Sequence, residues 1–152
     1  MTRVLCCIDD SAGAVSVVQV ARQLSDGLGL ELVLVHVAPH SHAPGVSAAV
    51  AGRERLLEEE RNEAEEVVRR VAAEAGIDSG TRTRAELGKS GERIVQLCDE
   101  EDASFVVMGS RGRGGLKAAV LGSTSLHVAG NAPCPCVIVP ASATTESESL
   151  TD

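Results

Sequence analysis

Short runs of aliphatic residues divide this chain, and the segments between them have the spacing of amphipathic helices. Strands are expected at residues 3–8, 30–37, 81–87, 104–108 and 136–139, the third of them edge-like. Helices are expected at residues 11–28, 53–75, 92–100 and 123–129, with a connection at 38–52 and a helical turn at 116–121. Strands that alternate with helices predict an α/β fold, an open five-stranded parallel sheet with helices on both faces.

The fourth predicted strand leads into a glycine-rich loop. Four glycines lie within residues 109–115, directly after the apolar run 105–108, and Gly122 precedes the three hydroxyl residues 123–125. Glycine lets a ligand approach bare backbone. A helix that begins at these hydroxyl residues, with Ser or Thr as its N-cap, presents free N–H groups and the positive end of its dipole. The pattern predicts a phosphate-binding loop.

Asp9 and the glycine-rich loop are expected to meet at one end of the sheet. In such sheets the ligand lies beyond the carboxyl ends of the strands, where the winding direction reverses. With strand order 3-2-1-4-5 this point lies between the first and fourth strands, which end at Asp9 and Gly109. Asp9 there contacts ribose or a magnesium ion, or else only caps the first helix beside Asp10 and Ser11.

The composition fits one cytoplasmic domain. A net charge of -8 disfavours non-specific attraction to nucleic acid or anionic membranes, and the chain lacks Trp and Tyr for stacking on RNA bases. No segment approaches the roughly 20 apolar residues of a membrane span. The five cysteines are expected to be reduced, small apolar residues, with Cys6 and Cys7 on opposite faces of a strand. We expect one nucleotide-binding domain at 1–140 and a disordered polar tail at 141–152.

Three patterns point to a known family. They are the opening Ile-Asp-Asp-Ser at 8–11, the run Leu-Val-His-Val at 34–37, and Gly109-x-x-Gly112 followed after nine residues by Gly122-Ser123. In these patterns the chain resembles the universal stress protein family over nearly all of residues 2–140. The glycine spacing resembles that of the ATP-binding branch of the family.

The resemblance implies a flavodoxin-like, Rossmann-like fold and a set of nucleotide contacts. By position, Asp9 and the backbone of Val37 hold the adenosine, and Met108 lines the base. The ribose and phosphates are contacted by Gly109, Gly112, Gly122, Ser123 and Thr124.

Arg111 and Arg113 make this loop more basic than is usual in the family. Arginine forks suit phosphate oxygens, so at least one of the two is expected to contact the terminal phosphates. The alternative is that both are solvated residues at a loop tip.

Other patterns do not support a site. Gly88-Lys89-Ser90 lacks the first glycine of a Walker A loop, since Thr83 stands there. The histidines at 36, 40 and 42 have no Cys or acidic ligand nearby in the sequence, which disfavours a metal. Ser123 and His127 lack an orienting acid for hydrolysis.

The function expected from these observations is binding of an adenine nucleotide, ATP or else ADP or AMP, with or without magnesium. The resemblance implies a homodimeric stress-response or signalling module that pairs through its last strand, Cys136 to Val139. One alternative is a slow ATPase or autophosphorylating enzyme, for which no persuasive general base is evident. The other is an interaction module whose nucleotide loop is vestigial.

Overall fold

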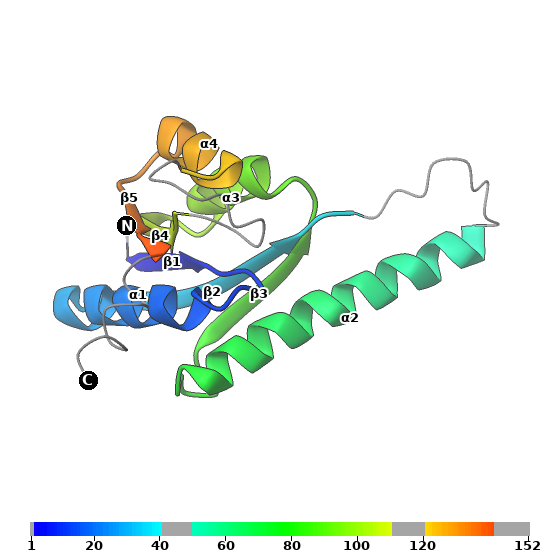
Figure 1. Ribbon diagram of the computed structural model, residues 1–152, viewed down its shortest axis with the longest axis horizontal. Helices are drawn as coiled ribbons and strands as arrows, with labels where there is room; N and C mark the ends of the chain where they lie inside the picture. Colours follow the sequence, from blue (N-terminus) through cyan, green and yellow to red (C-terminus); the bar gives the residue numbers. More distant parts are fainter. Residues whose placement is uncertain (1, 41–49, 111–120, 142–152) are drawn as a thin grey trace, which may run out of the picture.

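A single parallel sheet forms the centre of the molecule. The computed structural model describes residues 2–40, 50–110 and 121–141. The strands are β1 (Arg3–Cys7), β2 (Glu31–Ala38), β3 (Arg82–Leu87), β4 (Ala103–Gly109) and β5 (Cys136–Val139). They pair in the order β3-β2-β1-β4-β5, each parallel to its neighbours (Figure 1). The predicted α/β fold and strand order are confirmed.

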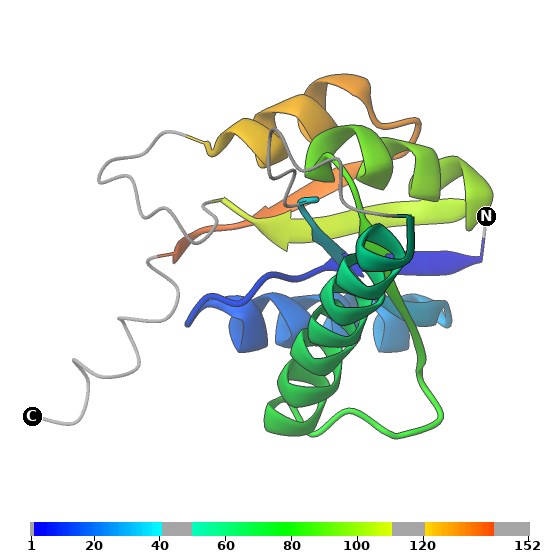
Figure 2. The same ribbon diagram turned by 90° about the vertical axis from the view of Figure 1, so that its right-hand side faces the viewer.

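Helices cover both faces of this sheet (Figure 2). The helices are α1 (Ala14–Leu28), α2 (Val50–Glu74), α3 (Ser90–Glu100) and α4 (Ser123–Asn131). One core lies under α1 and α2 and the other under α3 and α4. Successive strand residues alternate between these cores, so Cys6 packs in the first and Cys7 in the second, as predicted. Among the described segments, no helix is long and apolar enough to span a membrane.

Two of the predicted helix ends depend on glycine. Gly29 follows α1 with a φ of 67°, and Gly76 follows the end of α2 with a φ of 65°. These left-handed conformations favour glycine because it has no Cβ. The glycines therefore turn the chain back toward the next strand at the places where the sequence predicted.

The start of α1 differs from the prediction. The helix begins at Ala14 and not at residue 11, and its N-cap, Gly13, makes no side-chain capping hydrogen bond. Asp9 instead accepts the Ser11 N–H at Oδ1 over 3.1 Å, which closes an Asx turn before the helix. The alternative that Asp9, Asp10 and Ser11 cap the first helix is wrong. Asp9 and Ser11 form this turn before the helix begins, and no side chain caps α1.

Helix α2 is longer than predicted and only partly packed. It begins at Val50, so the expected connection at 38–52 is shorter. Its carboxyl-terminal half packs on β2 and β3 with Val68 and Val71 buried. Its amino-terminal half extends beyond the sheet (Figure 1), and the apolar side chain of Leu56 is 50% exposed there. The hydrophobic stripe of this helix is thus longer than the surface it covers.

Some predicted features fall outside the described residues. These are the three loop positions Arg111, Gly112 and Arg113 and the tail from residue 142 onward. Of the helical turn expected at 116–121 only Leu121 is described, and it is not helical.

Candidate functional site

A cavity of about 1230 Å³ opens at the carboxyl ends of β1 and β4. Its wall includes the starts of α1 and α4 and part of α2. Seven residues predicted from sequence lie in its lining, namely Asp9, Val37, Met108, Gly109, Gly122, Ser123 and Thr124. Two stretches of chain more than a hundred residues apart, around Asp9 and around Gly122, meet there because β1 and β4 are neighbours in the sheet. The position is the reversal point at which ligands bind in this class of sheet.

Asp9 is half-buried at the end of β1. One of its carboxylate oxygens, Oδ1, accepts the Ser11 N–H. Its other oxygen, Oδ2, has no hydrogen-bond donor among the described residues. A fixed carboxylate with one oxygen committed and one available is suited to accept a hydroxyl hydrogen from a ligand.

The first turn of α4 offers N–H groups to the cavity. Gly122 is its N-cap, and the first helical hydrogen bond runs from the Leu126 N–H to the Gly122 carbonyl over 2.9 Å. The N–H groups of residues 123–125 consequently have no acceptor within the described chain. Such groups, together with the helix dipole, favour an anion.

The predicted side-chain cap of α4 is wrong. No hydroxyl caps the helix, and Ser125 Oγ instead donates to the carbonyls of Gly122 and Ser110, at 3.0 and 3.2 Å. This hydroxyl therefore ties the helix start to the residue that follows β4. Because no side chain occupies the N–H groups of the first turn, they remain free for a ligand.

The ends of β2, β4 and β5 form the floor of the cavity. Met108 and Val37 are buried, and Ser90 Oγ donates to the Val37 carbonyl over a long 3.4 Å. Ser110 joins the ends of β4 and β5, since its N–H donates to Val139 and its Oγ accepts the Ala141 N–H. Burial raises the pKa of the Cys7 thiol, at the end of β1, well above its ordinary value, so this lining residue is a poor nucleophile.

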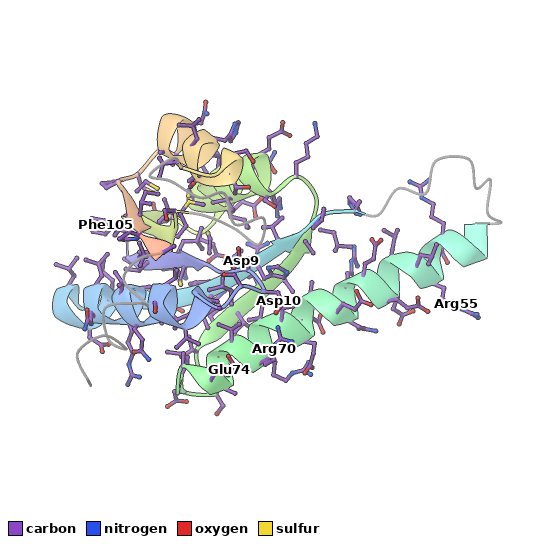
Figure 3. The ribbon with its side chains drawn as sticks, viewed as in Figure 1. Asp9, Asp10, Arg55, Arg70, Glu74 and Phe105 are labelled. Atoms are coloured by element: carbon purple, nitrogen blue, oxygen red, sulfur yellow. The ribbon has the colours of Figure 1, made fainter. Side chains whose placement is uncertain are left out.

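The wall that α2 contributes to the cavity was not predicted. Glu60, Glu63 and Glu66 line the cavity together with Arg70. Arg70 pairs with Asp10, and Figure 3 shows the two side chains meeting between α2 and the end of β1. Within the described lining, Arg70 is the one arginine or lysine against several carboxylates. The described rim is accordingly acidic.

His36 is a further lining residue that was set aside at the sequence level. Its Nδ1–H donates to the Ile8 carbonyl over 2.9 Å, which holds the ring against the end of β1. The described ranges contain no group of three histidine, cysteine or acidic residues placed to hold a metal ion. His36 is thus a polar lining group of the cavity.

Comparison with known proteins agrees with this architecture. The model of the universal stress protein family matches residues 1–140. Universal stress protein YxiE of Bacillus subtilis is 30% identical over 146 residues, which cover 90% of this chain and 97% of that protein. Universal stress protein MJ0531 of Methanocaldococcus jannaschii is 36% identical over 84 residues, 55% of this chain but only about half, 48%, of that protein.

A solved structure has the same fold. It is described as a universal stress protein in complex with cAMP, with a TM-score of 0.61 and 21% identity, and the match covers 91% of this chain and 96% of that chain. At 21% identity, this similarity shows only that the two proteins share a fold. The family model, by contrast, spans the sheet, its helices and every described residue of the cavity lining except Ala141. The chain therefore belongs to the universal stress protein family.

Proposed function

We propose that this protein binds an adenine nucleotide, with ATP preferred, in the cavity between β1 and β4. One observation carries the proposal: Asp9 with a free carboxylate oxygen and the uncapped first turn of α4 line the same cavity. A ribose hydroxyl and a phosphate need these two kinds of group, an acceptor and a set of N–H donors. The volume of about 1230 Å³ exceeds the roughly 300 to 1000 Å³ of common ligand pockets, so a nucleotide fits.

Each part of the nucleotide is assigned to the lining residues whose chemistry suits it. Asp9 Oδ2 accepts from the ribose, and the buried floor at Val37 and Met108 receives the adenine. The phosphates lie against the first turn of α4, with Gly109, Gly122, Ser123 and Thr124 as contacts. Gly112, Arg111 and Arg113 extend this phosphate site in the proposal.

The acidic rim affects which form of the nucleotide binds. Glu60, Glu63 and Glu66 repel a free polyphosphate, and this repulsion is reduced when a magnesium ion accompanies it. We therefore propose that the magnesium complex of ATP binds more tightly than free ATP. The relative in complex with cAMP supports a nucleotide as the class of ligand.

The proposed cellular role is a cytoplasmic, homodimeric stress-response or signalling module. Membership of the universal stress protein family supports the stress-response part. Strand β5 lies at an edge of the sheet and is the proposed dimer contact.

The decisive experiment examines the purified protein without added ligand. The chain has no Trp or Tyr, so a strong near-ultraviolet band of the native protein reports bound nucleotide, which mass spectrometry identifies after denaturation. Protein stripped of nucleotide is then titrated with ATP, ADP, AMP, cAMP and adenosine by calorimetry, with and without magnesium. We expect ATP with magnesium to bind most tightly. A protein that releases no nucleotide and binds none of the five ligands contradicts the proposal.

A further inference from the structure

An ion pair between two distant parts of the chain lies in the wall of the cavity. Arg70 of α2 donates from Nη2 to Oδ1 of Asp10, which follows Asp9 beyond the end of β1. The two residues are 60 positions apart in the sequence, and both line the cavity (Figure 3). The pair is therefore part of the candidate site.

Both ends of the pair are attached to packed structure. Arg70 lies on α2 between Val68 and Val71, each of which is 3% exposed, so the packing of the helix fixes its position. The hydrogen bond of Asp9 to the turn that follows β1 fixes the backbone next to Asp10. The paired side chains themselves are 44% and 40% exposed. Because an ion pair this exposed contributes little to the stability of a fold, the effect of its charges on a ligand is the more important consequence.

The pair alters the charge balance of the cavity. Five carboxylates belong to the described lining, those of Asp9, Asp10, Glu60, Glu63 and Glu66. Arg70 is the one arginine or lysine among the lining residues that the structure describes, and it neutralises the carboxylate beside Asp9. Without it, two adjacent aspartates would both repel a phosphate. Adenosine carries no charge, so its binding would not be affected.

We propose that Arg70 determines the specificity of the cavity for phosphorylated nucleosides, because it neutralises Asp10 and so lets a polyphosphate bind beside Asp9. This role rests on the proposed function and deepens it, since it assigns to one residue the preference for ATP over adenosine. Arg70 acts through Asp10 and through the charge of the cavity, so it is a positioning residue and not a ligand contact. Its effect should grow with the number of negative charges on the ligand, from AMP through ADP to ATP.

Solvent screening sets the size of the expected effect. Because both side chains are partly exposed, their charges act on the ligand largely through water, where salt weakens the interaction over a Debye length of about 10 Å at 0.1 M. At low ionic strength we expect a change of roughly three- to tenfold in the affinity for ATP. In 1 M salt, where the Debye length is about 3 Å, the change should fall below about twofold.

Calorimetry on variants of the full chain tests the proposal. Each protein is titrated with ATP, ADP, AMP and adenosine at low salt and without magnesium, so that the phosphates keep their full charge. Arg70→Gln should bind ATP roughly three- to tenfold more weakly, with smaller losses for ADP and AMP and none for adenosine. Asp10→Asn leaves Arg70 without its counter-charge and should bind ATP more tightly by a similar factor. The double variant has the net charge of the wild-type pair and should return to the wild-type affinity.

The signs of these changes separate a role in specificity from a purely structural one. If the pair only held α2 in place, Arg70→Gln, Asp10→Asn and the double variant would all lose affinity, for adenosine as well as for ATP. Arg70→Lys keeps the charge and should bind ATP as the wild type does. Arg22→Gln and Asp26→Asn are matched controls that should change none of the four affinities, because these residues form an exposed ion pair on α1 outside the cavity lining.

Failure of this role and failure of the proposed function give different results. A wild type that binds ATP and adenosine, with the same ratio of the two affinities as Arg70→Gln, overturns the role of Arg70 and leaves the nucleotide site in place. Weaker binding of ATP by Asp10→Asn also overturns it. A wild type that binds none of the four ligands overturns the proposed function, and the role of Arg70 with it.

Discussion

Asp9 combines a structural role and a proposed ligand role in one carboxylate. The Asn side chain keeps the oxygen that accepts the Ser11 N–H, so Asp9→Asn should preserve the turn. It loses the negative charge offered to the ribose, and a hydrogen bond to a charged group contributes about 1.5 to 3 kcal/mol. Affinity for adenosine and ATP should therefore fall roughly ten- to hundredfold with little change in melting temperature.

Calorimetry and thermal unfolding measure the two consequences separately. Asp26→Asn is a suitable control, because Asp26 lies on α1 outside the cavity lining and its side chain is 75% exposed. It should leave both quantities unchanged. Equal affinity of the wild type and Asp9→Asn would remove Asp9 from the proposed site.

The buried environment of Glu101 predicts that this residue contributes to the stability of the fold. It is 1% exposed, and its Oε1 accepts from Arg82 and Arg84 at 3.0 and 2.8 Å. Its Oε2 lies 3.5 Å from Arg3 and has no hydrogen bond within the described chain. Replacing it by Gln leaves three arginines without their shared counter-charge. Because these arginines are partly solvated, we expect a loss of about 2 to 4 kcal/mol, less than the roughly 3 to 5 kcal/mol of a fully buried pair that is broken.

Urea unfolding of Glu101→Gln and Glu100→Gln measures this difference. The neighbouring Glu100 pairs with Arg84 and Arg93 at the surface, where ion pairs contribute less than about 1 kcal/mol. Similar midpoints for the two variants would mean that burial of Glu101 adds nothing to the stability of the fold.

At the scale of the element, α2 has two halves with different surroundings. Val71, in the packed half, is 3% exposed, whereas Leu56, in the extended half, is 50% exposed. Val71→Ala should destabilise the fold by about 2 kcal/mol, through lost burial and the cavity left behind. Leu56→Ala removes a larger side chain yet should cost less than about 0.5 kcal/mol. The denaturant midpoints of the two variants measure these losses of stability. A larger loss of stability for Leu56→Ala than for Val71→Ala would show that the extended half is packed in solution.

These halves also show what the sequence could predict and what it could not. Helical periodicity identified α2 and its buried stripe, because spacing is a local property. It did not show where the stripe leaves the sheet, since that depends on the lengths of β2 and β3. Arg70 in the cavity wall was missed for the same reason, as its neighbour Asp10 lies 60 positions away. The start of α4 was located correctly, but its predicted cap was wrong because the N-cap position is Gly122, which has no side chain.

At the scale of the whole molecule, the two cavity elements come together through strand order. Asp9 and Gly109 were predicted at one crevice because the reversal of winding in a 3-2-1-4-5 sheet falls between β1 and β4. The structure confirms that order and lines one cavity with both residues. Contacts from Arg111, Gly112 and Arg113 remain predictions, as these positions lie outside the described residues.

The order of the strands also places β5 at an edge of the sheet. We therefore predict a homodimer whose two copies pair through β5. An edge strand presents unpaired backbone groups that a second copy can satisfy. Sedimentation should therefore give a mass twice the 15.7 kDa of the chain. In a symmetric pair the same residue of both copies lies near the contact, so Val137→Lys on β5 places like charges close together and should shift the protein toward monomer.

Leu126→Lys is the matched control for this change. Leu126 lies on α4 and is 61% exposed, so a lysine there adds the same charge away from the edge strand. It should leave the dimer intact. Val137 is partly buried, and circular dichroism must first show that Val137→Lys keeps its helices at the temperature of the sedimentation run. A folded Val137→Lys that remains dimeric, or a Leu126→Lys that becomes monomeric, would move the interface from β5 to another surface.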